Sequence, residues 1–282
     1  MNTTQQSGSL AEQIAQITVD QGHLAVWALG QHGFVLKGAE TVVVIDPYLS
    51  NYVEELSPDV KRLVPIVVQP DELEMVDVLL ISHAHADHCD PRTLGPLLEA
   101  APQARVVTSY RARDEIRGFG FDTTRVEVPQ IDQPIACNDN LTITAIPAAH
   151  YEQEPDEHGN PAYLGFLITL NDVTLYHSGD TIIYPGLLER LQSHSIDLAC
   201  LPINGGDWFR EQQDIIGNMD YREAAELAAR VGVKVLLPSH NDMFRGNQIN
   251  PAYLLDYLAT HHPQQRVHFL QAGELYYYVS YV

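Results

Sequence analysis

Residues 82–90 read Ser82-His83-Ala84-His85-Ala86-Asp87-His88-Cys89-Asp90 and place three imidazoles and a carboxylate within six positions. An apolar run, residues 76–81, precedes them and Pro91 follows, which predicts a loop between a buried strand and a new helix. Asp90 and Pro91 have their own structural explanation as the N-cap and first residue of that helix. A strand-to-helix loop with this composition is a good place to hold a metal ion.

The side chains of this loop are typical ligands of a divalent cation. Without one, Asp87 would lose solvation and each imidazole would need a partner for both ring nitrogens. Neutral imidazoles bind zinc at ~2.0–2.1 Å, and the same ligand types accept manganese or iron. His83 and His85 alternate and face one side, while Asp87 and His88 can turn to a second position. The alternative, unliganded loop histidines, fits the scattered His23, His194, His261, His262 and His268 better than this cluster.

Other candidate ligands stand where further apolar runs end. Small residues lead into His150, Asp180 and His240, each directly after a predicted strand, and Asp46 follows another. Sites in α/β folds are built at strand ends, and small residues let the backbone approach a centre closely. We therefore expect His150, Asp180 and His240 to join the loop as ligands, with Asp46 anchoring a ligand from outside.

The remaining pattern predicts an α/β fold. Apolar, β-branched runs predict strands at residues 24–29, 34–36, 41–45, 141–146, 163–170, 173–176, 198–203, 233–237 and 275–281. Helical periodicity occupies residues 185–191, 221–231 and 251–260. Tight turns at residues 31–33 and 38–40 predict that the chain begins with an antiparallel meander.

Composition narrows the classes of partner and compartment. The 282-residue chain has a formal net charge of -21, which disfavours nucleic acid and anionic membranes as partners but leaves a small anionic metabolite possible. Three widely spaced cysteines without a Cys-x-x-Cys pattern are typical of reduced thiols, and the polar N-terminus does not resemble a secretory signal, so we expect a cytoplasmic protein. We expect a polar tail with a short helix at residues 1–18 and a single hydrolase domain at residues 19–282.

The ordered ligand set resembles that of the metallo-β-lactamase superfamily, which has a His-x-His-x-Asp-His loop followed by a later His, an Asp and a final His. Residues 27–34, 45–50, 61–65, 147–150, 176–181 and 201–205 are further similar to the L-ascorbate 6-phosphate lactonase branch. The chain departs from that branch at His32, where a small residue is commoner, and along residues 206–214. Both departures lie in segments expected to touch substrate, so they bear on substrate identity.

The resemblance implies an αββα sandwich, with two mixed β-sheets face to face, helices outside and metals at one edge. It implies one ion held by His83, His85 and His150, a second held by Asp87, His88 and His240, and Asp180 as the bridge. A hydroxide bridging the two ions would be the nucleophile, so no serine or cysteine is needed. Asp87 is also a candidate proton relay to the leaving group. Seven candidate ligands are too many for a closed four-ligand structural site.

Substrate contacts are predicted at Gln31, Tyr48, Asn204 and Arg210. Gln31 and Tyr48 lie just beyond strand ends, and the Arg210 guanidinium could clamp a phosphate or carboxylate. Equally, Arg210 could pair with Glu211 or another surface neighbour.

The sequence thus predicts a hydrolase dependent on one or two divalent ions (Mn²⁺ or Zn²⁺, with Fe²⁺ also suitable) that opens a small sugar-acid lactone, with or without a phosphate group. The resemblance further implies a homo-oligomer. Two alternatives stay open: a metal-dependent phosphodiesterase, and a non-catalytic metal-dependent sensor on the same fold.

Overall fold

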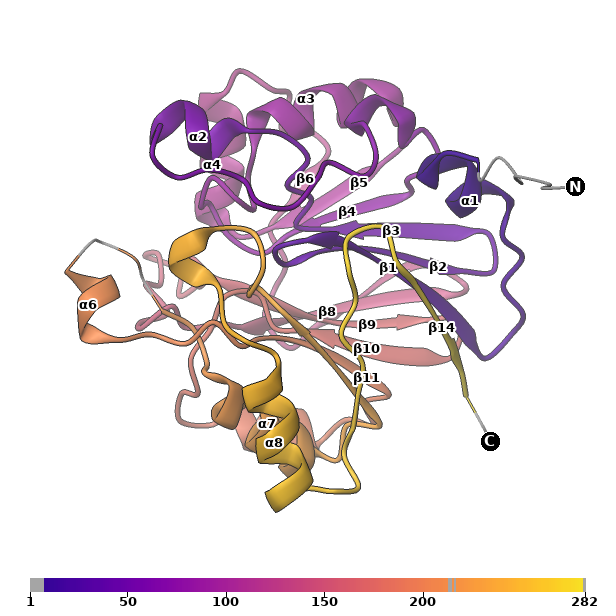
Figure 1. Ribbon diagram of the computed structural model, residues 1–282. Helices are drawn as coiled ribbons and strands as arrows, with labels where there is room; N and C mark the ends of the chain where they lie inside the picture. The colour runs from indigo at the N-terminus through magenta and orange to yellow at the C-terminus, as the bar shows by residue number, and fades with distance from the viewer. Residues whose placement is uncertain (1–7, 213–214, 216, 281–282) are drawn as a thin grey trace, which may run out of the picture.

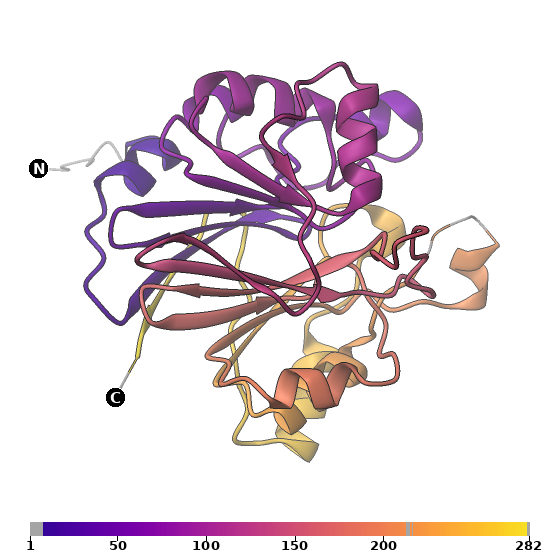
Figure 2. The same ribbon diagram turned by 180° about the vertical axis from the view of Figure 1, so that it is seen from behind.

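The computed structural model describes residues 8–212, 215 and 217–280, and it has four layers. Two seven-stranded sheets face each other, helices α2, α3 and α4 cover the outer face of the first, and α7 and α8 cover the second (Figure 1). The same layers are seen from behind in Figure 2. This arrangement confirms the expected αββα sandwich.

The first sheet has the strand order β14-β1-β2-β3-β4-β5-β6, and the second has the order β13-β12-β11-β10-β9-β8-β7. The first sheet contains β1 (His23–Gly30), β2 (Gly33–Gly38), β3 (Thr41–Ile45), β4 (Val78–Ile81), β5 (Arg105–Thr108), β6 (Val126–Glu127) and β14 (Leu275–Val279). The second contains β7 (Pro134–Asn138), β8 (Leu141–Pro147), β9 (Leu164–Leu170), β10 (Val173–His177), β11 (Leu198–Pro202), β12 (Val235–Ser239) and β13 (Arg266–Val267).

The helices lie between and after these strands. They are α1 (Leu10–Gln16), α2 (Tyr52–Leu56), α3 (Pro91–Ala100), α4 (Tyr110–Gly118), α5 (Leu187–Gln192), α6 (Trp208–Glu211), α7 (Tyr221–Val231) and α8 (Ala252–His261), with short 3₁₀ turns η1 (Pro70–Glu72) and η2 (Arg245–Asn247). Among the described residues, no helix combines the length and apolar character needed to span a membrane.

Each sheet begins as an antiparallel meander and continues with parallel strands. In the first sheet β1, β2 and β3 are antiparallel neighbours and β3 to β6 are parallel. In the second, β7 to β10 are antiparallel and β10 to β13 are parallel. The predicted early meander is therefore confirmed. The repeated pattern brings the carboxyl ends of β4, β10 and β12 to one end of the sandwich, as the ligands that follow them require.

Side chains that alternate along a strand point to opposite faces of the sheet and join two different hydrophobic cores. In β1, Leu24 and Val26 face the second sheet, whereas Ala25 and Trp27 face the helices of the first layer, and all four are fully buried. Strands buried on both faces read as continuous apolar runs, which is why they were detectable in the sequence.

Several elements were not predicted from the sequence. β5, β6, β7 and α4 lie between the predicted helix after Pro91 and the strand at 141–146. β7 alternates exposed and half-buried residues at the edge of its sheet, and β6 has only two residues. Short or edge strands bury too little apolar surface to leave a clear pattern.

Helix α1 packs into the main core, although the sequence places it in the N-terminal tail. Leu10, Ala11 and Ile14 join the first-sheet core, while residues 1–7 lie outside the described part of the chain. Lys37 of β2 is buried, and its Nζ donates to the carbonyl oxygens of Ile14 at 2.8 Å and Ala15 at 2.9 Å. This ammonium satisfies carbonyls that would otherwise be unpaired at the end of the helix.

Replacing Lys37 by methionine should lower the free energy of unfolding by about 1.5–3 kcal/mol, because charged hydrogen bonds to buried carbonyls are lost. Lys61→Met is the control, since Lys61 pairs with Glu54 at the surface and should matter little. Urea unfolding measures both variants. Equal effects of the two substitutions would contradict the proposed tie between β2 and α1.

Candidate metal centre

The loop that follows β4 carries the ligand cluster and runs into α3, as predicted. Asp90 caps α3 by accepting from the backbone N–H of Arg92 at 2.8 Å, and Pro91 is the first helical residue. His83 and His88 are almost fully buried, whereas His85 and Asp87 are partly exposed. The loop therefore holds His83 and His88 in the protein interior and leaves His85 and Asp87 open to solvent.

The predicted ligands form two adjacent groups. One contains His83, His85, His150 and Asp180, and the other contains Asp87, His88 and His240; within each group the ligand atoms all lie within 4.8 Å of one another. Asp180 lies between the groups: its Oδ1 is 3.5 Å from His88 Nε2, and its Oδ2 is 3.1 Å from His240 Nε2 and 3.8 Å from His150 Nε2. The structure thus brings together the seven residues that the sequence predicts as ligands.

Unpaired buried atoms show that the cluster fits a cation. His83 Nε2, His88 Nε2 and Asp180 Oδ1 are buried and have no hydrogen-bond partner. The other ring nitrogens of the two histidines are already used, at 2.9 Å from Ser82 Oγ for His83 and at 2.8 Å from Asp46 Oδ2 for His88. Orphaned polar atoms at this depth are costly unless a further partner binds them, and a divalent ion is such a partner.

The electrostatics of the cluster also favour positive charge. Burial alone would lower the pKa of His88, but the surrounding carboxylates, led by Asp180, raise it to about 10. Burial alone would raise the pKa of Asp180, but His240 and His88 hold it well below its usual range. The same field that holds a proton on an imidazole would stabilise a metal ion in its place.

Asp46, at the end of β3, anchors the ligand loop. Its carboxylate accepts from the Ser82 backbone N–H at 2.7 Å and from Ser82 Oγ at 2.5 Å, and it is 2.8 Å from His88 Nδ1. It thereby fixes the start of the loop and the orientation of the His88 ring. This is the outer anchoring position that the sequence predicts for Asp46.

Three residues at the cluster have a left-handed backbone conformation. Gln31, Asp46 and His240 all have positive φ angles, of 56°, 43° and 56°. The His240 N–H donates to the Gln31 carbonyl at 2.7 Å, so the two left-handed residues brace each other. Such conformations are held only where the surrounding structure over-determines them.

Gly179 lets the second sheet approach the ligand loop. Its φ is 58°, and a Cβ there would collide with the carbonyl oxygen of Leu164 and lie 2.9 Å from Ser82 Cβ. The small residues before Asp180 are thus required by close packing.

A second pair of histidines lies beneath the cluster. His32 and His177 are fully buried, and their ring centroids are 3.9 Å apart. His32 Nδ1 is 2.7 Å from Ser239 Oγ and its Nε2 is 3.2 Å from the Gly179 carbonyl, so it connects the residues just before His240 and Asp180. The sequence predicts that the segment around His32 touches substrate, but the structure buries His32 below the ligands. His177 was missed, although a histidine three residues before a ligand at a strand end was a usable signal.

The four predicted substrate contacts have different surroundings. Gln31 is part of the cluster, because its Nε2 donates to Asp87 Oδ2 at 2.6 Å. Tyr48 is buried and packs against Phe244, with ring centroids 5.8 Å apart. Asn204 is buried, and its Oδ1 accepts from Asn218 Nδ2 at 3.3 Å. None of Gln31, Tyr48 and Asn204 lines the pocket over the cluster.

Arg210 is engaged within its own loop. Its Nη1 donates to the carbonyls of Asn204 and Gly205, and its Nε is 3.4 Å from Asp207 Oδ2. This resembles the structural alternative foreseen from the sequence, with Asp207 as partner in place of Glu211. Of the adjoining stretch 206–214, residues 213–214 lie outside the described residues.

A pocket of about 300 Å³ opens over the ligand cluster. Its floor consists of His85, Asp87, His150, Asp180 and His240. Its walls come from Val53, Ile215, Phe244 and Asn247, none of which the sequence singled out. They stand on segments far apart in the chain and share no motif, so only the folded structure brings them together.

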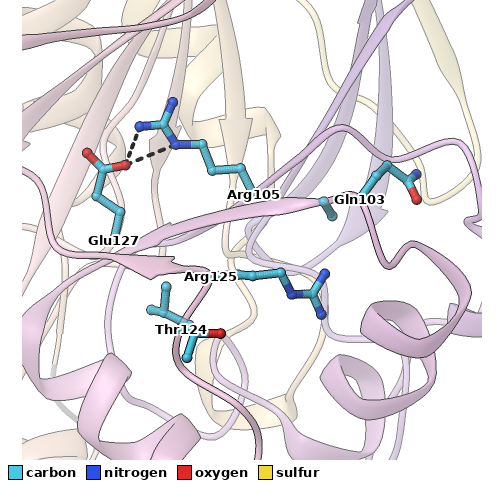
Figure 3. Close-up of a pocket in the computed structure, with 7 residues that line it drawn as sticks. Gln103, Arg105, Thr124, Arg125 and Glu127 are labelled. Atoms are coloured by element: carbon cyan, nitrogen blue, oxygen red, sulfur yellow. Dashed lines mark hydrogen bonds and ion pairs between the residues drawn. The ribbon is translucent and has the colours of Figure 1, made fainter.

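A second hollow, of about 330 Å³, lies between β5 and β6 and has a different character (Figure 3). Arg105 pairs there with Glu127, and Arg125 donates to the carbonyl of Pro102. None of the candidate metal ligands lines this hollow.

The αββα sandwich with paired His/Asp groups at one end defines a class of protein built to hold metal ions. A family model described as a β-lactamase superfamily domain matches residues 41–241, and the chain belongs to this family. The match spans the ligands from His83 to His240.

Relatives and solved structures agree with this assignment. A UPF0173 metal-dependent hydrolase of Hyperthermus butylicus is 28% identical over 250 residues, covering 88% of this chain and 96% of the relative. Another, from Thermococcus kodakarensis, is 29% identical over 216 residues, covering 75% and 82%. An isothiocyanate hydrolase from Delia radicum gut bacteria has a similar fold, with a TM-score of 0.69 at 19% identity, covering 91% of this chain and 100% of that one.

Replacing Asp46 by asparagine should weaken metal binding by about 10–100-fold, the usual cost of losing an outer partner of a ligand. Chelator competition against Zn²⁺ or Mn²⁺ measures the affinity. Asp77→Asn is the matched control, because Asp77 also accepts from a backbone N–H, that of Val42, but has no contact with the cluster. An unchanged metal affinity in Asp46→Asn would show that Asp46 does not support the metal ligands.

Proposed function

We propose that this member of the β-lactamase superfamily is a metal-dependent hydrolase and that its substrate is a small lactone. The observation that carries the proposal is the pair of adjacent ligand groups, with the oxygens of Asp180 near histidines of both, at the floor of an open pocket. A structural metal site would be closed by its ligands, whereas a catalytic one keeps a position open.

The residues present define what they would hold. His83, His85 and His150 would bind one divalent ion, and Asp87, His88 and His240 a second, with Asp180 between them. Ions bound there would supply a Lewis acid for a carbonyl oxygen and lower the pKa of a bound water toward ~7. Imidazole and carboxylate ligands accept zinc, manganese and iron.

Water is the nucleophile that the pocket favours. No serine, threonine or cysteine occurs among the described residues that line it, so no side-chain nucleophile faces a bound substrate. In lactone opening, a water oxygen adds to the carbonyl carbon, the ring C–O bond breaks, and the water proton goes to the leaving alkoxide.

Asp87 is suited to carry that proton. Its side chain is 18% exposed, compared with 4% for Asp180, so of the two carboxylates on the pocket floor it is the more accessible to a substrate. The Gln31 amide holds Asp87 Oδ2 from the other side at 2.6 Å and fixes the direction of the carboxylate. We therefore assign Gln31 to positioning Asp87 and Asp87 to proton transfer.

A phosphodiesterase acting on nucleic acid is the weaker alternative. The net charge of -21 gives no general attraction for a polyanion, and the described lining of the pocket has no lysine or arginine. A sensor is also possible on such a fold, since fold and metal alone do not fix activity.

Protein loaded with Mn²⁺ or Zn²⁺ should open members of a lactone panel, and Asp180→Asn should lower kcat by at least about 100-fold, more than the loss of an outer-shell partner costs. Asp132→Asn, at a surface ion pair with Arg190, is the control and should keep full activity. The rate of lactone opening is measured from the proton that each hydrolysis event releases.

Two results would contradict the proposal. No hydrolysis of any lactone by protein with full metal content would exclude a lactonase. If neither the wild-type protein nor Asp180→Asn hydrolyses a lactone, but Asp180→Asn still binds it, the sensor is favoured.

A further inference from the structure

We propose that the pocket over the metal centre accepts an uncharged substrate with an apolar substituent and discriminates against phosphorylated ones. This inference rests on the proposed lactone hydrolysis and narrows its substrate class. It also replaces the anionic metabolite that the sequence predicts as partner.

The described residues of the pocket walls are apolar or neutral. Val53 of α2, Ile215 and Phe244 present aliphatic and aromatic surface, and the polar residue in the wall, Asn247, carries no charge. Below them, the ionisable groups are imidazoles and the carboxylates of the ligand cluster. A substrate would therefore place its ester group on the floor and its substituent against Val53 and Phe244.

Arg62 and Arg210 are engaged elsewhere, whereas Arg245, next to Phe244 in the chain, is exposed and is not among the residues that line the pocket. The Arg62 guanidinium lies over the Tyr48 ring, 4.9 Å from its centroid, and donates to the carbonyls of Val64 and Tyr48 at 2.7 and 2.8 Å. Its Nη2 has no partner but is buried, out of reach of a ligand in the pocket. Arg210 holds the carbonyls of its own loop.

A phosphate in this pocket would lose hydration without gaining a cationic side chain from the described residues that line it. Taking a charged group out of water is costly unless it is paired and hydrogen-bonded. An alkyl substituent instead gains by burial, about fourfold in binding for each methylene removed from water.

Two exposed apolar side chains stand on helices at one end of the molecule. Leu56, on the same helix as Val53, is 59% exposed, and Trp208 of α6 is 64% exposed. Both views of the ribbon place α2 and α6 at the same end of the molecule (Figures 1 and 2).

The test compares two lactones with the same ring, one with an alkyl substituent and one with a phosphate at the same carbon. With metal-loaded full-length protein, kcat/KM should be at least about tenfold higher for the alkyl lactone. Calorimetry with the two cyclic ethers that lack the carbonyl gives a readout that does not depend on turnover. The alkyl ether should bind and the phosphorylated ether should not.

Two variants connect the preference to the walls. Val53→Lys adds a cation to the pocket and should shift the ratio of kcat/KM toward the phosphorylated lactone by about tenfold. Arg245→Gln removes the exposed cation beside Phe244 and should leave the ratio unchanged. A loss of phosphate-lactone hydrolysis in Arg245→Gln would show that a cation serves the site.

The outcomes separate the two proposals. Preference for the phosphorylated lactone would overturn this inference and leave lactone hydrolysis intact. If neither lactone is opened, the lactonase proposal fails and the ethers decide the inference: binding of the alkyl ether alone supports it, while binding of the phosphorylated ether alone, or of neither, overturns it.

Discussion

The structure depends on the need of buried imidazoles and carboxylates to share a cation. Four histidines of the cluster are nearly inaccessible to solvent: His83, His88, His150 and His240. Each has one ring nitrogen without a hydrogen-bond partner, and the other ring nitrogen of His240 lies 3.1 Å from the buried carboxylate of Asp180. In an apolar interior such groups are tolerated only when paired. Two ions at this place would give His83 Nε2, His88 Nε2 and Asp180 Oδ1 the partner that each of them lacks.

The fold meets this need by repetition. Each sheet passes from an antiparallel meander into parallel strands, and the ligands follow the carboxyl ends of strands in both sheets. Asp46 from the first sheet orients His88, while His32 connects Gly179 and Ser239 of the second. A displacement of one sheet against the other would therefore disturb both ligand groups. The geometry of the metal centre therefore depends on the two sheets keeping their relative position.

The ligands were predictable from the sequence because their signal is local. Six positions carry the loop from His83 to His88, and His150, Asp180 and His240 each stand directly after an apolar run. The pocket walls were not predictable, since Val53, Ile215 and Phe244 meet only through tertiary packing. Arg210 shows the same limit: its charge pointed to a substrate clamp, but its contacts with backbone carbonyls depend on the shape of its loop. β7 and α4 lacked a clear apolar period and were missed.

The central claim is that Asp180 joins two metal positions. Anomalous X-ray diffraction from crystals grown with Mn²⁺ or Zn²⁺ tests this most directly, because it locates each ion independently of activity. We predict two peaks, one among His83, His85 and His150 and one among Asp87, His88 and His240, with Asp180 oxygens reaching both. A single ion closed by four protein ligands, or peaks away from Asp180, would contradict the account.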